Sequence, residues 1–272
     1  MEFAARTVLR FGVGLLGARI TLDQITALGA APILLVAGAV VVTIVFGALI
    51  ARFFERSTAE GVLTGGAVAI CGASAALAIS AVLPRGERSS QFTLLTVVGV
   101  TALSTLAMIL YPAVVRLLDL DAAGAGLFLG GTIHDVAQVV GAGYMISPEA
   151  GVHATFVKLF RVAMLVPVVL VLSFLYRRRG AASGTRAPLL PWFLVLFVVL
   201  AAVNSAGWIP LRAGDWLATF SRWCLVAAIA ALGIMTSFAE LAALGWQPVI
   251  LMLAETAFLA VLIVTGLLLL GV

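Results

Sequence analysis

The stretch GGTIHDVAQVVGAG, residues 130–143, decides how this sequence is interpreted. It places His134, Asp135 and Gln138 in a glycine-rich run with strongly apolar sequence on both sides. The 272 residues are 63% hydrophobic and 10% charged, against roughly 25% charged residues in soluble globular domains. Apolar runs of about 20 residues recur along the chain, and a helix of that length spans the hydrocarbon layer of a bilayer. The sequence therefore predicts an integral membrane protein with an ionisable pair inside the lipid layer.

Nine hydrophobic segments have lengths that suit spanning helices. The prediction is an all-α polytopic membrane protein whose residues 1–272 form a single transmembrane transporter domain. Membrane barrel strands are excluded because they would alternate apolar and polar residues. The expected segments cover residues 3–19, 30–51, 61–83, 91–115, 124–147, 152–176, 189–209, 216–238 and 247–271.

The charged residues between these segments predict an orientation. The net charge of +4 comes almost wholly from loops, so it indicates membrane topology rather than nucleic-acid binding. If every segment crosses once, the excess of arginine predicts a cytoplasmic N-terminus and an outside C-terminus in the plasma (inner) membrane. The inside group is Arg6, Arg10, Arg52, Arg56, Arg116, Arg177, Arg178, Arg179 and Arg186, and the outside group is Arg19, Arg85, Arg88 and Arg212.

Two stretches of the sequence resemble each other. Residues 15–35, LLGARITLDQITALGAAPILL, and residues 231–251, ALGIMTSFAELAALGWQPVIL, share a Leu-Gly pair, an Ala-Leu-Gly triplet and a proline at the same spacing. The copies begin seven segments apart and so face opposite ways if each segment crosses once. This pattern predicts an inverted repeat, which is common in secondary transporters.

The third and fifth segments are rich in glycine, which destabilises a helix interior by about 1 kcal/mol relative to alanine. Close helix packing through small residues is one interpretation. The other is that both helices break and cross near the midplane, which is tolerated where the break lines a cavity walled by protein.

Few polar groups fall within the segments. A charge inside the membrane is costly, so charged residues there are rare unless they have a function. His134 and Gln138 share a helical face, and so do Lys158 and Arg161. Asp135 needs a partner, which Lys158 or Arg161 could provide in a purely architectural ion pair. Alternatively, the cations attract an anion and His134 and Asp135 hold or relay a proton, since histidine has an unperturbed pKa near 6.5. Glu255 is open to both a transport role and a neutral, buried one.

Other chemistry is not indicated. Cys71 and Cys224 lie far apart in apolar surroundings, so we expect buried thiols rather than a disulfide or a metal site. Neither a metal nor a cofactor is expected. An intramembrane enzyme is disfavoured, because the sequence lacks Gly-x-Ser-x-Gly and His-Glu-x-x-His motifs and His153 is its only other histidine.

Four stretches, FGVGLLGARITL, AICGASAA, GGTIHDVAQVVGAG and VKLFRVAMLVPV, occur in the order that resembles the YeiH-type membrane proteins, a family named for sulfate export. More distantly, the chain resembles the cation/proton antiporter and bile-acid symporter superfamily. Members of the YeiH-type family carry additional helices before the first of these stretches, so we expect such helices to be missing here. The resemblance carries site roles onto Gly131, Thr132, His134, Asp135, Gln138, Cys71, Gly72, Ser74, Lys158 and Arg161.

The resulting prediction is a secondary transporter that exports a small anion such as sulfate or an organosulfonate, with coupling to protons. Its expected partners are the anionic substrate and the lipid bilayer. The sequence leaves open a passive anion channel or a structural membrane protein that does not transport. It also leaves the oligomeric state open, with a homodimer as one alternative.

Overall fold

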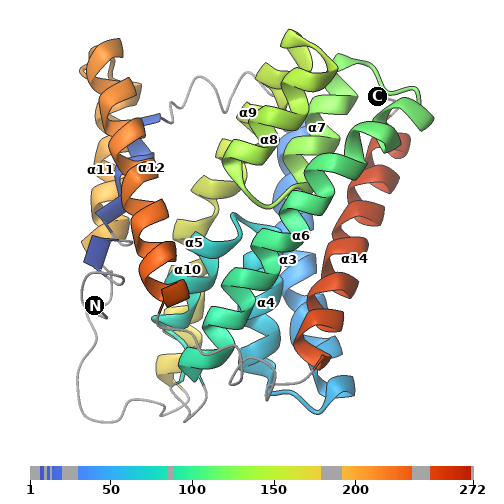
Figure 1. Cartoon of the computed structure of the whole chain (residues 1–272), viewed down its shortest axis with the longest axis vertical. Helices are drawn as coiled ribbons and strands as arrows, with labels where there is room; N and C mark the ends of the chain where they lie inside the picture. The colour runs from blue at the N-terminus through green and yellow to red at the C-terminus, as the bar shows by residue number, and fades with distance from the viewer. Residues whose placement is uncertain are drawn as a thin grey trace.

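The computed structural model describes residues 7–8, 11–12, 14–19, 30–84, 89–178, 192–234 and 246–270, and every regular element in these ranges is helical (Figure 1). This confirms the all-α prediction for the described residues. The elements are η1 (Leu16–Arg19), α3 (Ala30–Ile50), η2 (Ala51–Phe54), α4 (Thr58–Ala69), α5 (Ala73–Ser80), α6 (Ser89–Leu117), α7 (Ala122–Thr132), α8 (Val136–Ile146), α9 (Pro148–Ala163), α10 (Leu165–Arg178), α11 (Trp192–Ser205), α12 (Leu211–Ile234) and α14 (Gln247–Leu270).

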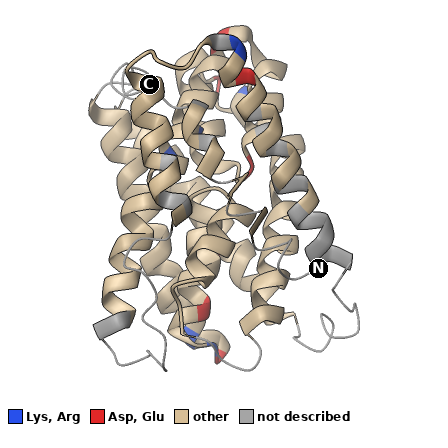
Figure 2. Cartoon of the chain, turned by 90° about the vertical axis from the view of Figure 1, so that its left-hand side faces the viewer, with Lys and Arg blue, Asp and Glu red and all other residues tan. Residues whose placement is uncertain are grey.

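Four described stretches are long and apolar enough to cross a membrane: Ala30–Phe54, Ser89–Leu117, Pro148–Tyr176 and Gln247–Leu270. Their large exposed side chains are mostly aliphatic, as expected for helices that face lipid. The charged residues of the described part gather mainly at the two ends of the bundle, with few between them (Figure 2). The described residues do not confirm nine spans. The inverted repeat stays a prediction, because much of both copies, including residues 27–29 and 243–245, lies outside the described residues.

The fifth predicted segment is interrupted at residues 133–135, as expected, but it does not continue across the bundle. A Cβ at Gly126 would meet His153 and one at Gly130 would meet Val157, so α7 and α9 run in the same direction. Gly143 lies against Gly151, so α8 and α9 are antiparallel. The helices α7 and α8 therefore form a hairpin that enters and leaves at one end of the bundle.

The third segment folds back in the same way. It is interrupted at residues 70–72, and a Cβ at Gly66 in α4 would meet the side chain of Ile79 in α5. In a continuous helix these two residues would be about 20 Å apart at 1.5 Å per residue. The 12 residues of α4 and the 11 of α7 reach about 16–18 Å, roughly half of a 30 Å hydrocarbon layer.

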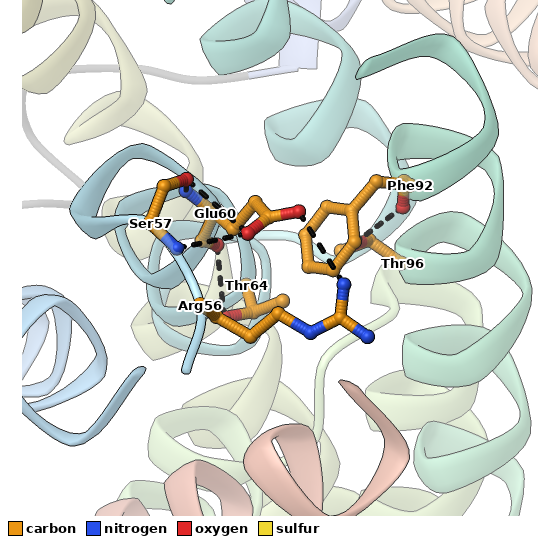
Figure 3. Close-up of polar contacts among 6 residues, drawn as sticks. All are labelled: Arg56, Ser57, Glu60, Thr64, Phe92 and Thr96. Atoms are coloured by element: carbon orange, nitrogen blue, oxygen red, sulfur yellow. Dashed lines mark hydrogen bonds and ion pairs between the residues drawn. The ribbon is translucent and has the colours of Figure 1, made fainter. Parts of the chain in front are cut away.

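The helix α4 starts from a well-defined cap at the end of the bundle. The Ser57 side chain accepts a hydrogen bond from the Glu60 main-chain N–H, and the Glu60 carboxylate accepts one from the Ser57 N–H at 2.9 Å (Figure 3). This reciprocal arrangement satisfies two N–H groups at the start of the helix. Arg56 pairs with Glu60 at 3.8 Å. The base of the first hairpin is thus fixed by polar groups, whereas its far end points into the bundle.

The two hairpins approach from opposite ends. The base of α4 follows η2, the base of α7 follows the far end of the 29-residue α6, and Figure 1 shows α4 low and α7 high in the bundle. The prediction that segments three and five each cross the membrane once is therefore wrong. Glycine-rich breaks allow a chain either to continue or to reverse, and tertiary contacts such as that between Gly66 and Ile79 make it reverse here.

Candidate functional site at the hairpin tips

The turns of the two hairpins meet inside the bundle. We call residues 70–72 and 133–135 the hairpin tips. Gly72 has a left-handed φ of +64° and forms the N-cap of α5, a conformation that favours glycine. A Cβ on Gly72 would lie 3.6 Å from the His134 Cβ, so the tips are in direct contact. All four helix ends of the two hairpins therefore come together at one place.

Lys158 joins the two tips. It lies on α9, has no exposed surface, and its Nζ donates hydrogen bonds to the carbonyls of Ile70 at 2.6 Å and Ile133 at 3.0 Å. One carbonyl belongs to each tip. The C-terminal end of a helix carries about half a negative charge, so an ammonium group here stabilises the ends of both α4 and α7.

Arg161, one turn along α9, makes the same connection with more bonds. It also has no exposed surface. Its guanidinium donates to two carbonyls at the end of α4, Ala69 at 2.8 Å and Val68 at 2.8 Å. It also donates to Gly130 at 2.9 Å and Ile133 at 3.0 Å. A planar fork of five N–H groups suits this divergent set of acceptors.

His134 is fully buried and both of its ring nitrogens are engaged. Nδ1 lies 3.0 Å from the Val68 carbonyl and Nε2 lies 3.1 Å from the Thr256 hydroxyl on α14. A carbonyl only accepts, so Nδ1 carries the proton, and in the neutral ring Nε2 accepts from Thr256. His134 therefore connects the second hairpin to α4 and α14.

Asp135 and Gln138 face a different neighbour. Asp135 is exposed, its main-chain N–H donates to Ser104 of α6, and its carboxylate accepts from the Gln138 N–H at 3.4 Å, as an N-cap of α8 does. The Gln138 side chain donates to Thr105 of α6 at 2.9 Å. Within the described part of the chain, the hydrogen bonds of Lys158 and Arg161 all end on main-chain carbonyls and none goes to Asp135.

The other predicted site residues divide between the tips and the helix packing. Cys71 is a buried free thiol at the first tip and accepts a hydrogen bond from Ser74 at 3.2 Å. Thr132 donates back to the Phe128 carbonyl of its own helix. Gly131 faces Ile263 of α14, where a Cβ would be 3.2 Å away. Six of the predicted site residues thus lie around the tips: Cys71, Gly72, Ser74, His134, Lys158 and Arg161. Gly131 instead packs α7 against α14, and Thr132 forms a hydrogen bond within α7.

Sequence reasoning missed the acceptors of the site. The carbonyls at the ends of α4 and α7 carry no side-chain signal, because every residue has one. Thr256 and Ser104 were also missed. Thr256 could have been noticed as a polar neighbour of Glu255 in an apolar helix, whereas Ser104 is an ordinary small residue of α6.

Apolar helices of spanning length, charges at the bundle ends and two hairpins whose tips meet inside the bundle define a polytopic helical membrane protein. The chain belongs to the family described as Conserved hypothetical protein 698, whose model matches residues 1–252. It is 54% identical over 265 residues to a UPF0324 membrane protein of Chlorobaculum tepidum, covering 97% of this chain and 74% of that protein.

Two further relatives have similar identity over the whole chain. The UPF0324 membrane protein TauZ of Paracoccus denitrificans is 53% identical over 274 residues, covering 100% of this chain and 81% of that protein. A UPF0324 membrane protein of Rhizobium meliloti is also 53% identical, with 100% and 79% covered. No solved structure matches. The resemblance to YeiH-type proteins is confirmed at the level of the family, whereas sulfate export and the link to the superfamily stay predictions.

Proposed function

We propose that the protein is a secondary transporter of a small anion, such as sulfate or an organosulfonate, and that the anion binds at the hairpin tips. One observation carries this proposal. Lys158 and Arg161 are both fully buried at the tips, and in the described part of the chain neither forms an ion pair with a carboxylate. Buried cations of this kind in a membrane protein mark a functional site more often than a structural one.

The sum of charges at the tips supports an anionic ligand. The C-terminal ends of α4 and α7 contribute about half a negative charge each, whereas Lys158 and Arg161 contribute one positive charge each when they are protonated. The N-terminal ends of α5 and α8 add about half a positive charge each. Asp135 offsets one unit from an exposed position. The remaining charge is about +1, which favours a sulfonate or a sulfate over a cation.

Donors for an oxyanion are available at the same place. Lys158 has three N–H groups and uses two, and Arg161 has five and uses four. Gly72, at the N-cap of α5, has no side chain to cap the helix, and uncapped N-terminal N–H groups bind anions. The Ser74 hydroxyl lies in the first turn of α5. These groups would replace part of the hydration shell of the anion.

A purely structural role is the second candidate, and one observation favours it. Most N–H groups of Lys158 and Arg161 already bind the ends of α4 and α7. In this alternative the two cations only hold the hairpins together, and no ligand enters. The two functions differ in whether a particular anion stabilises the protein.

The hairpins also change the expected distribution of loop charges. If residues 58–80 and 122–146 re-enter at their own side and the other segments cross once, Arg85 and Arg88 move to the cytoplasmic side and Arg116 moves outside. The chain ends keep their sides, and the arginine excess on the cytoplasmic side increases. We therefore retain a cytoplasmic N-terminus and an outside C-terminus. Accessibility of single cysteines at positions 56 and 116 to a membrane-impermeant reagent tests this orientation.

The function is tested on the purified protein in detergent. Sulfate, methanesulfonate and chloride are titrated at constant ionic strength while the unfolding temperature is measured. We expect one oxyanion to stabilise the protein specifically, by about 2.7 kcal/mol at a concentration 100-fold above its Kd. The same anion should then exchange across proteoliposomes with saturable kinetics. Equal response to all three anions supports the structural role, and flux that stays linear with concentration supports a channel.

A further inference from the structure

Glu255 is the most deeply buried carboxyl group of the described residues, and no part of the proposed anion site uses it. It lies on α14, the ninth residue of a 24-residue apolar helix, and has no exposed surface. Its Oε1 accepts a hydrogen bond from the Thr64 hydroxyl of α4 at 2.7 Å. Its Oε2 is buried and has no hydrogen-bond partner among the residues that the structure describes.

Two glycines, Gly47 of α3 and Gly61 of α4, make room for the Glu255 side chain. A Cβ on Gly47 of α3 would collide with Glu255 Oε1, and one on Gly61 of α4 would collide with the Gly47 carbonyl. The backbones of α3 and α4 therefore touch, and the space that a side chain at Gly47 would fill is occupied by the carboxyl group. A hydrophobic residue at position 255 would pack against such a seam at no electrostatic cost, so the carboxyl group calls for a functional explanation.

No cation neutralises this carboxyl group within the described part of the chain. The helices α3 and α7, which pack on α14, contain no titratable residue. The titratable groups on the other neighbours are Glu60 on α4, Tyr111 and Arg116 on α6, and Arg52 on η2. None of them contacts Glu255. His134 lies nearby through Thr256, but its two nitrogens bind Val68 and Thr256.

A carboxylate with one hydrogen bond, no cation and no exposed surface is strongly disfavoured, whereas the neutral acid is tolerated. A metal ion such as Na⁺ would require several oxygen ligands, whereas among the described residues only Thr64 forms a hydrogen bond with Glu255. A bound proton requires no further oxygen ligand. The unpartnered Oε2 is the atom that would carry it.

We propose that Glu255 is a proton-binding site that couples anion transport to the proton gradient. The coupling role rests on the proposed transport function, whereas proton binding does not. In the conformation described here the group is protonated, and it releases its proton in a conformation that admits water between α4 and α14. His134 and Asp135, which the sequence pattern favours for this role, are less suited, since the first is fixed between two partners and the second is already exposed.

The test separates proton binding from transport. Infrared spectra of the purified protein are recorded against pH, and the carbonyl stretch of a protonated carboxyl group is followed. Wild type and the control Glu149→Gln, which changes an exposed acid in the first turn of α9, should show this band near neutral pH. Glu255→Gln, which has nearly the same shape as the neutral acid, should lack it. A band that persists in Glu255→Gln overturns the proposal.

Proteoliposomes give the second measurement. Glu255→Gln should exchange anion for anion at a rate within about two-fold of wild type but lose proton-driven accumulation at least ten-fold. Glu255→Asp, which keeps a titratable group, should recover part of the accumulation. Unchanged accumulation in Glu255→Gln, or accumulation that follows a sodium gradient and ignores pH, overturns the coupling role. If wild type moves no anion at all, the transport function fails, while the infrared result still decides whether Glu255 binds a proton.

Discussion

Replacement of Arg161 by methionine should loosen both hairpins at once. The substitution removes four hydrogen bonds to carbonyls. Two of these carbonyls keep another donor, because Val68 also accepts from His134 and Ile133 also accepts from Lys158. Ala69 and Gly130 lose their donor. Each buried acceptor left without a partner costs about 1–3 kcal/mol, which gives about 2–6 kcal/mol for Arg161→Met.

The effect is measured as the unfolding temperature in detergent without added oxyanion. For a chain of this size 1 kcal/mol corresponds to about 2–4 °C, so a loss of about 4 kcal/mol should lower the midpoint by roughly 8–16 °C. Arg116→Met is the matched control, since Arg116 is an exposed arginine in the last turn of α6, and should change stability by less than about 0.5 kcal/mol. If Arg161→Met melts with the wild type, the cation does not hold the ends of α4 and α7 together, and the account of the tips is wrong.

Three further predictions concern the same structure. Gly47→Ala should destabilise the protein by about 1–3 kcal/mol through overpacking against Glu255 and Gly61. The control Gly38→Ala, in the same helix but with nothing within 4 Å of the added Cβ, should be neutral or stabilise the protein by up to about 1 kcal/mol. The unfolding temperatures of the two variants test this difference. Gly130→Ala should separate α7 from the Ala154 carbonyl of α9 and lower both stability and anion exchange, and wild-type exchange would contradict the hairpin packing. Asp135→Asn removes an exposed negative charge that offsets the cations at the tips, so it should strengthen oxyanion binding in the detergent titration, and weaker binding would contradict the sum of charges at the tips.

The helices could be predicted from the sequence because their signal is local. The predicted segment at residues 30–51 became α3 and the one at 247–271 became α14, each within one residue at either end. The two interruptions were also predicted, since glycine and adjacent polar residues disfavour a continuous apolar helix. The local sequence does not indicate whether the chain continues or reverses after the break. A run of glycine permits both directions, and contacts with residues far along the chain select one.

The partners of the buried cations were unpredictable for a different reason. Sequence reasoning pairs a cation with an acidic side chain, and Asp135 was the nearest candidate in an almost uncharged chain. In the structure the negative partner of Lys158 and Arg161 is the backbone itself, concentrated where α4 and α7 end. Such partial charges exist only once the helices stop inside the bundle. The role of the cations therefore depends on the hairpins, which the sequence did not reveal.

Glu255 and the hairpin tips are linked through neighbouring residues of the same two helices. On α14, Glu255 binds Thr64, and the adjacent Thr256 binds His134, which in turn binds Val68. Thr64 and Val68 are one turn apart on α4. A change in the spacing of α4 and α14 that exposes Glu255 would therefore also act on the carbonyl that Val68 shares between His134 and Arg161. Coupling between a proton at Glu255 and an anion at the tips needs no long pathway, because both sites act on the same contact between two helices.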